Sequence, residues 1–105
     1  MFKLVALWSP PKPGDRAAFE AAYINTHAPL ARALPNLAAL DTILLAEGLE
    51  GAPADHHRVA IMSWADKAAF ERDGETPQWT ALRTDAGQMI ERFGVTLHSS
   101  MGEDG

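Results

Sequence analysis

Two apolar runs in this sequence carry hydrophobic side chains at both odd and even positions, and this feature limits the folds open to the chain. Side chains point alternately to the two faces of a β-strand. In the run from Phe2 to Trp8 the even-numbered residues would share one face, yet Val5 and Leu7 on the other face are also apolar. The run from Val59 to Trp64 repeats this pattern. A sheet built from these strands must therefore be covered on both sides.

The first helix is predicted from Asp15 to about residue 26 or beyond. Asp15 is a good N-cap residue, and apolar side chains follow it at helical spacing. Pro29 interrupts the pattern, because proline has no N–H with which to bond the carbonyl of Asn25. We therefore expect a kink or a helix restart at Pro29, with His27 at the end of the first helix.

The remaining chain predicts three more strands and two more helices. Residues 37–46 and 59–64 are expected to form antiparallel strands joined by a polar loop, and residues 93–99 the last strand. Asp66 is expected to cap a short helix, and Thr76, followed by Pro77, a longer one. The order strand–helix–strand, then strand–helix–helix–strand, is that of a ferredoxin-like α+β fold, βαββαβ with an antiparallel sheet.

In this fold the helices cover one face of the sheet, and no predicted element is left to cover the other. Self-association through the second sheet face is the simplest solution. We therefore expect a homodimer.

The length of 105 residues suits a single domain, residues 1–105, with an ordered core over 2–100 and a frayed tail at 101–105. The formal net charge of −5, without a Lys/Arg cluster, argues against nucleic acid and anionic membranes as partners. The absence of cysteine excludes disulfides, zinc–thiolate sites and cysteine nucleophiles. No apolar run approaches the ~20 residues of a membrane helix, and no signal peptide is recognised. We expect a cytoplasmic protein.

The segment AAFEAAYINTHAPLARALPNL resembles proteins of the EthD-like family. Their pattern is F-x-x-x-Y/W-x-x-x-H-x-P-L followed by P-x-L, and the matching residues here are Phe19, Tyr23, His27, Pro29, Leu30, Pro35 and Leu37. The resemblance covers about residues 2–100 and includes FKLVALW and VAIMSWADKAAF. It implies a dimeric α/β barrel, in which two ferredoxin-like sheets face each other with helices outside. The family is linked to bacterial catabolism, and relatives of the barrel include monooxygenases without metals or flavins, lactone isomerases and haem proteins.

His27 and Tyr23 are the candidate catalytic residues. An unperturbed imidazole titrates near pH 6.5, so His27 could accept or donate a proton. A position at a helix C-terminus would favour the imidazolium form, and the free carbonyl of Asn25 would orient the ring or a bound water. Tyr23, one turn earlier, could place its hydroxyl beside the imidazole. The structural alternative is a buried histidine that ties the kinked helix end to the backbone.

Large apolar side chains are the candidate lining of a ligand pocket between the sheet and the helices. Core packing is the competing interpretation, since aromatic residues dominate the cores of small domains. The candidates are Trp8, Phe19, Leu30, Trp64 and Trp79.

No metal and no cofactor are expected. A metal site formed by His27, His57 and His98 is conceivable, but no spacing enforces it and no carboxylate accompanies the histidines. Haem binding through a histidine is disfavoured by the short chain.

Two functions remain open. The first is a cofactor-independent enzyme of small-molecule catabolism, a monooxygenase or other oxidoreductase or an isomerase. It would act on a small, mostly apolar, oxygen-bearing metabolite, with His27 moving a proton and Tyr23 assisting by hydrogen bonding. The alternative is a non-catalytic dimer that binds such a molecule or supports a neighbouring enzyme.

Overall fold

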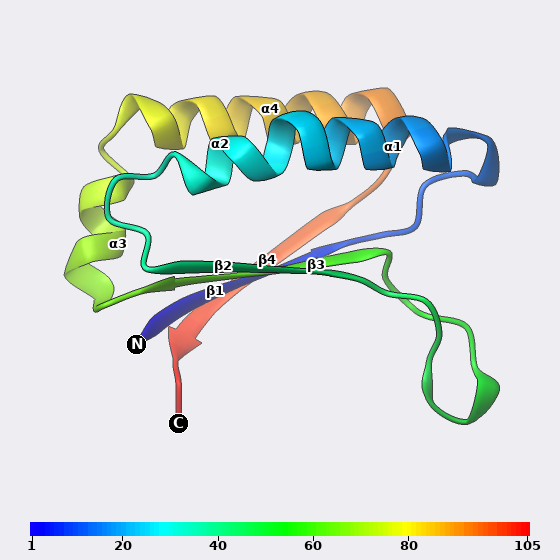
Figure 1. Ribbon diagram of the computed structural model, residues 1–105, viewed down its shortest axis with the longest axis horizontal. Helices are drawn as coiled ribbons and strands as arrows, with labels where there is room; N and C mark the ends of the chain where they lie inside the picture. The colour runs from blue at the N-terminus through cyan, green and yellow to red at the C-terminus, as the bar shows by residue number, and fades with distance from the viewer.

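The computed structural model describes all 105 residues and contains one four-stranded antiparallel sheet (Figure 1). The strand order is β2-β3-β1-β4. The two central strands are the predicted apolar runs, β1 (Phe2–Trp8) and β3 (Arg58–Trp64), and the two edges are β2 (Ala39–Leu44) and β4 (Leu97–Glu103). The predicted ferredoxin-like α+β class is confirmed.

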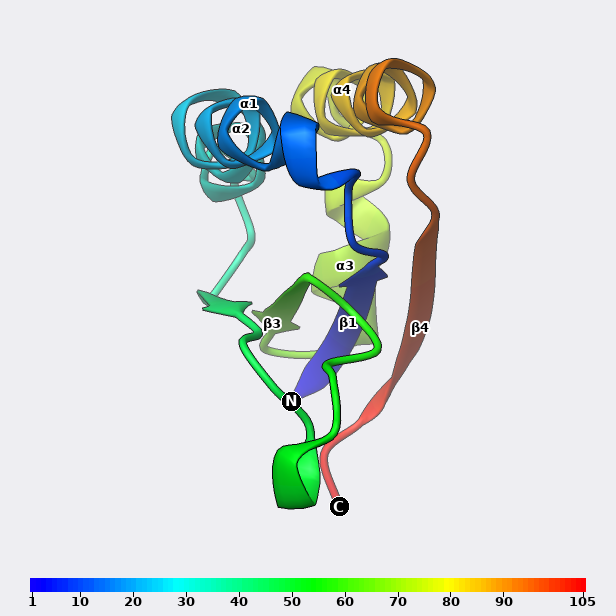
Figure 2. The ribbon, with the colours of Figure 1, turned by 90° about the vertical axis from the view of Figure 1, so that its right-hand side faces the viewer.

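Three of the four helices lie over one face of the sheet, and the fourth stands at its end (Figures 1 and 2). The first helical stretch contains α1 (Arg16–Ala22) and α2 (Ala28–Arg32), and α4 (Pro77–Phe93) runs beside it. The short helix α3 (Lys67–Asp73) closes the end of the sheet.

Two of the three predicted N-caps are confirmed. The side chain of Asp66 accepts a hydrogen bond from the Ala69 amide at 2.8 Å, and Thr76 accepts one from the Trp79 amide at 3.2 Å. Asp15 was predicted wrongly, because its side chain makes no capping hydrogen bond. A 3-10 turn at Pro13–Asp15 leads into α1, so Asp15 already has helical backbone angles instead of the extended angles of a capping residue.

The first helix does not end near His27. A π-helical turn (Tyr23–His27) joins α1 directly to α2, and the amide of Ala28 bonds to the carbonyl of Tyr23, five residues back. Pro29 explains this widening, since its ring would collide with the carbonyl four residues earlier in a regular α-helix. The predicted irregularity at Pro29 is therefore present as a π-turn in a continuous helix, with His27 in its interior.

The last strand lies four residues further along the chain than predicted. The helix α4 continues to Phe93 and ends at Gly94, whose φ of 63° is the left-handed conformation of a helix C-cap. The strand β4 then pairs with β1 as far as Glu103, opposite Phe2. The expected tail is therefore part of the sheet up to Glu103, and Asp104 forms an ion pair with the N-terminal amino group.

The sheet face opposite the helices is apolar at its centre. Val5 and Ile61 are opposite each other in the β1–β3 pairing, as are Leu7 and Val59, and all four side chains are half-buried. Ile43 on β2 is 45% exposed on this face. None of the helices is long and apolar enough to span a lipid bilayer.

Candidate functional site

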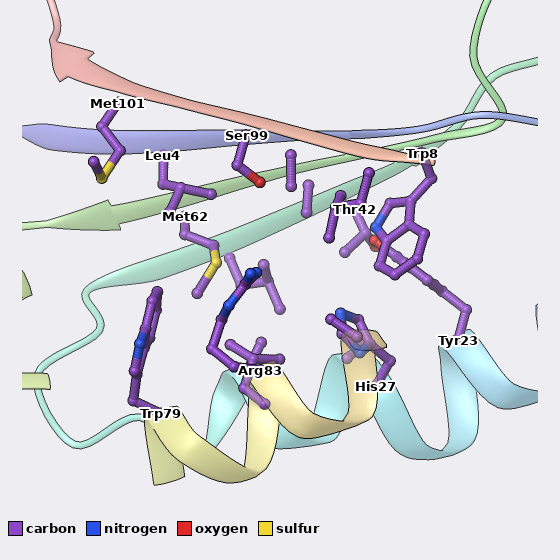
Figure 3. A pocket seen from close by; sticks show the side chains of 18 of the residues that line it. Leu4, Trp8, Tyr23, His27, Thr42, Met62, Trp79, Arg83, Ser99 and Met101 are labelled. Atoms are coloured by element: carbon purple, nitrogen blue, oxygen red, sulfur yellow. The ribbon is translucent and has the colours of Figure 1, made fainter. Parts of the chain in front are cut away.

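A cavity of about 390 Å³ lies between the sheet and the helices (Figure 3). Its volume falls within the range of roughly 300–1,000 Å³ that is typical of small-molecule sites. Sixteen of the twenty lining residues are hydrophobic, and the other four are His27, Thr42, Arg83 and Ser99. The solvent-exposed lining residues all belong to α4 and β4, so the cavity opens between these two elements.

His27 projects from the π-turn towards the sheet (Figure 3). Its Nδ1 atom lies 2.8 Å from Oδ2 of Asp85 on α4. A carboxylate can only accept, so Nδ1 carries the hydrogen and donates it. In the neutral ring, Nε2 then keeps a lone pair, and it makes no hydrogen bond within the protein. This arrangement leaves His27 with a free proton acceptor at the cavity.

Burial lowers the pKa of His27, because desolvation disfavours the charged ring. The hydrogen bond to Asp85 and the charge of Asp85 act in the opposite direction, while the nearby charge of Arg83 lowers the pKa further. The expectation of a favoured imidazolium form was wrong. It assumed a helix C-terminus at His27, whereas the helix continues into α2 and the ring is buried.

The predicted orienting contact was also wrong. The His27 ring is held by Asp85 on the neighbouring helix, and no side-chain hydrogen bond joins it to the carbonyl of Asn25. The ring is further fixed by the edge of Trp8, with centroids 5.2 Å apart at an interplanar angle of 86°. The orientation of His27 therefore comes from tertiary packing.

Tyr23 lies beside His27 with ring centroids 5.7 Å apart, and it lines the same cavity. Burial raises the pKa of Tyr23, so its hydroxyl remains protonated at neutral pH. No hydrogen bond joins this hydroxyl to His27 or to any other group of the protein. It is therefore free to bond to a ligand.

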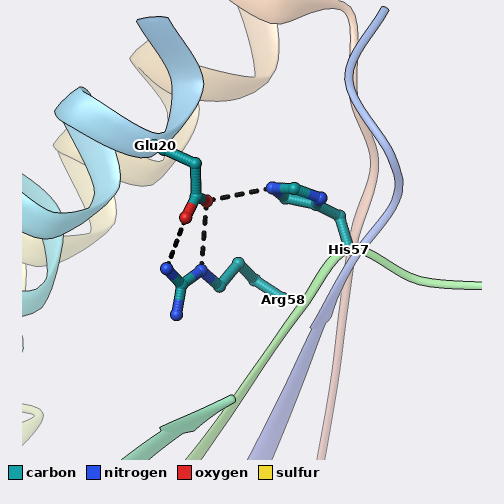
Figure 4. Close-up of polar contacts among 3 residues, drawn as sticks. All are labelled: Glu20, His57 and Arg58. Carbon is teal, nitrogen blue, oxygen red and sulfur yellow. Dashed lines mark hydrogen bonds and ion pairs between the residues drawn. The ribbon is translucent and has the colours of Figure 1, made fainter. Parts of the chain in front are cut away.

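A cluster of three polar side chains holds α1 against β3 next to Tyr23 (Figure 4). Glu20 accepts hydrogen bonds from Arg58, whose Nε atom is 3.1 Å away, and its Oε2 atom lies 2.9 Å from Nε2 of His57. The bonded guanidinium lowers the pKa of Glu20, against a smaller opposing effect of burial. The same guanidinium lies 4.8 Å from the ring centroid of Tyr23, so the cluster fixes the position of that ring.

Of the predicted pocket residues, Trp8 and Trp79 line the cavity together with His27 and Tyr23. Three others do not. Phe19 is fully buried and packs with Trp8, Tyr23 and Phe93. Leu30 packs against the core cluster that contains Phe2, Leu4 and Trp64. Trp64 is also fully buried, and its Nε1 donates to Asp73 at 2.7 Å instead of facing the cavity.

The histidines do not converge on one point. His27 bonds to Asp85, His57 bonds to Glu20, and His98 is exposed on β4. No group of three or more histidine, aspartate or glutamate side chains is placed to hold a metal ion.

Asp85 and Arg83 are the two site residues that sequence reasoning missed. A signal was present, because Asp85 shares a helical face with Leu82, Ala86 and Met89, which are buried. A carboxylate on the apolar face of an amphipathic helix requires a partner. Arg83 lies one helical turn after Trp79, which was a predicted pocket residue and lines the cavity. This spacing could have indicated that Arg83 faces the same cavity.

Comparison with solved structures supports the fold and the family resemblance. An ethyl tert-butyl ether D (EthD) family protein from Bacillus halodurans C-125 superposes with a TM-score of 0.88 at 28% identity, covering 100% of this chain and 99% of that one. The chain is therefore similar to an EthD family protein over its whole length. Family models and curated protein sequences give no match.

Two further solved structures share the fold with this chain. HapK from Hahella chejuensis has a TM-score of 0.66 at 22% identity, covering 99% of this chain and 92% of its own. SnoaB from Streptomyces nogalater, described as a cofactor-independent oxygenase, has a TM-score of 0.65 at 17% identity, covering 99% and 92%. At these identities the comparison concerns the architecture alone.

The surroundings of His27 predict opposite pKa changes in two variants. Asp85→Asn should lower the pKa of His27 further, because it removes a hydrogen bond and a negative charge that favour the cation. Arg83→Met should raise it, because it removes a nearby positive charge. NMR titration of the ring protons, assigned by comparison with His27→Gln, measures both changes. A wild-type pKa above the ordinary value of about 6.5 would contradict this description.

The lowered pKa of His27 makes the stability of the protein depend on pH. The unfolded chain takes up a proton near pH 6.5, whereas folded His27 takes it up at lower pH. The unfolded state therefore binds more protons in this window, and the contribution of His27 to stability is lost as the pH falls through the folded pKa.

Proposed function

We propose that this EthD-like protein binds a small, mostly apolar, oxygen-bearing metabolite in the cavity and removes a proton from it with His27. One observation carries the proposal: His27 donates through Nδ1 to Asp85 and leaves Nε2 free at an apolar cavity. A neutral, desolvated imidazole held by a carboxylate is a suitable general base near neutral pH. The fold shared with a cofactor-independent oxygenase supports a role in small-molecule metabolism.

The reaction begins when Nε2 of His27 takes a proton from an acidic C–H or O–H group of the ligand. Asp85 stabilises the imidazolium that forms, in addition to fixing the tautomer. The hydroxyl of Tyr23 donates a hydrogen bond to the ligand oxygen. The electron pair left on the ligand is the starting point for isomerisation, elimination or oxygenation, and a ligand that keeps its proton would be bound without turnover.

A bicyclic ketone, 2-tetralone, provides a test that requires no knowledge of the natural substrate. Its α-protons exchange with deuterium when a base removes them, and proton NMR in D₂O follows the loss of signal. We expect the protein to accelerate the exchange in a saturable manner. Saturable binding of 2-tetralone without any acceleration would indicate the non-catalytic alternative.

We also propose that the outer sheet face pairs with a second copy of the chain to form a dimeric barrel. The apolar centre of this face, defined by Val5, Leu7, Val59 and Ile61, has no cover in the monomer. The loop between β2 and β3 extends on the same side of the sheet (Figure 1). It carries Leu49, which is 89% exposed. Both features suit burial against another protomer.

The dimer predicts a strong effect of a charge at the centre of this face. Ile61→Asp should weaken self-association by roughly 100-fold, because the carboxylate would be buried twice in a symmetric interface. Light scattering coupled to size exclusion at micromolar concentration should report a dimer for the wild type and a monomer for the variant. Ile24→Asp makes the same change at an exposed position on the helical side and should remain dimeric. A monomeric wild type would contradict the proposal.

A further inference from the structure

Arg83 is the one cation that lines the cavity, and it has no anionic partner. It belongs to α4, lines the cavity and is exposed, so it lies at the opening between α4 and β4. The ion pairs of the protein involve Lys3, His27, His57, Arg58 and the N-terminal amino group, and none involves Arg83. Figure 3 shows its side chain rising from α4 towards the sheet, among the other cavity side chains.

The position of Arg83 is unusual for an arginine on a helix surface. Its neighbours on the cavity wall are mainly hydrophobic, with Trp79 one turn before it and Ala86 nearly one turn after it on the same helix. Asp85 lies two residues away, but its carboxylate is bonded to His27 and forms no ion pair with Arg83. A guanidinium directed at an apolar cavity retains five N–H donors for a ligand.

Arg83 and His27 can contact the same ligand in the cavity. Both line the cavity, and the charge of Arg83 is close enough to His27 to disfavour its protonation. When a base removes a proton from carbon next to a carbonyl group, the electron pair moves onto the carbonyl oxygen, which becomes an oxyanion. A cation at a fixed position beside that oxygen stabilises the product of proton removal more than it stabilises the neutral ligand.

We infer that Arg83 is an oxyanion-binding residue and that the ligand is a carbonyl compound or carboxylate whose negatively charged oxygen pairs with its guanidinium. This inference rests on the proposed function for its account of the reaction, because His27 takes the proton whose loss places the charge on that oxygen. The binding site itself requires only the cavity and Arg83. The apolar walls hold the carbon skeleton, and the charged oxygen points towards the opening.

A pair of probes of the same shape isolates the charge. 2-Naphthoate carries a carboxylate where 2-naphthamide carries a neutral amide. Trp8 and Trp79 line the cavity, so quenching of tryptophan fluorescence at neutral pH measures binding of both. We expect the wild type to bind naphthoate about tenfold more tightly than naphthamide, the value of a charge-assisted hydrogen bond at a partly exposed site.

Substitution of Arg83 assigns the preference to one residue. Arg83→Met should bind the two probes equally, and Arg83→Lys should keep part of the preference for naphthoate. Arg92→Met is the matched control, since Arg92 is an exposed arginine of the same helix that does not line the cavity. It should preserve the full preference, which separates a contact with Arg83 from a change in net charge.

The outcomes separate this inference from the proposed function. His27→Gln should keep the preference for naphthoate while it loses the exchange of 2-tetralone protons. Exchange in the wild type together with equal binding of the two probes would overturn the inference and leave the base intact. A naphthoate preference that depends on Arg83, without exchange, would support the inference and contradict the base. Preference unchanged in Arg83→Met, or no binding of either probe, would overturn the inference.

Discussion

Replacing His27 by glutamine is expected to reduce the protein-catalysed exchange of 2-tetralone protons by roughly 10²- to 10⁴-fold, the usual contribution of a positioned general base. Glutamine preserves polarity and approximate size but has no group that accepts a proton near neutral pH. The remaining rate would come from binding in the apolar cavity. Proton NMR in D₂O measures the exchange in both proteins under the same conditions.

Asp85→Asn provides a second variant that leaves the imidazole in place. Its amide can donate to Nδ1 and thereby favour the tautomer in which Nε2 carries the hydrogen, so the exchange rate should also fall. Circular dichroism and the fluorescence affinity for 2-naphthamide show whether each variant retains its fold and cavity. Exchange that persists at the wild-type rate in a folded His27→Gln would eliminate His27 as the base.

The elements that sequence reasoning predicted well depend on local signals. The caps formed by Asp66 and Thr76 could be predicted from the sequence, because each capping hydrogen bond joins residues only three positions apart. The last strand is predicted four residues too early, because Phe93, Val95 and Leu97 alternate as the residues of a strand would, although Phe93 belongs to α4. Gly94, which ends the helix in the left-handed conformation, was the available signal.

The candidate site could be predicted only in part, because its polar contacts join distant segments. The motif directed attention to His27 and Tyr23, and the structure places both at the cavity. The partner of His27 is 58 residues away on another helix. Which side of α4 faces α1 and α2 depends on side-chain packing, and helical periodicity gives only the apolar face. Phe19 was predicted to line the pocket because it belongs to the motif, but it packs in the core instead.

Replacement of Asp73 by an apolar residue is expected to reduce stability strongly. Its side chain is fully buried, and it accepts hydrogen bonds from Nε1 of Trp64 at 2.7 Å, from the Asn36 amide at 3.0 Å and from Nδ2 of Asn36 at 2.8 Å. It thereby joins the end of α3 to β3 and to the segment that leads into β2. Asp73→Leu leaves these donors without an acceptor, at roughly 1–3 kcal/mol for each buried group. We expect the free energy of unfolding to fall by about 3–5 kcal/mol, a large share of the ~5–15 kcal/mol of a typical domain.

Urea denaturation at a fixed protein concentration measures this loss as a lower midpoint with an unchanged slope. Asp73→Asn keeps one carbonyl acceptor but turns an amide towards the other donors, so its loss should be intermediate, about 2 kcal/mol. Glu71→Leu removes a carboxylate from an exposed position of the same helix and should change stability by no more than about 0.5 kcal/mol. A loss below about 1 kcal/mol in Asp73→Leu would mean that Trp64 and Asn36 find other acceptors. In that case the junction of α3 with the sheet would depend on apolar contacts such as Trp64 against Phe70, whose ring centroids are 4.9 Å apart.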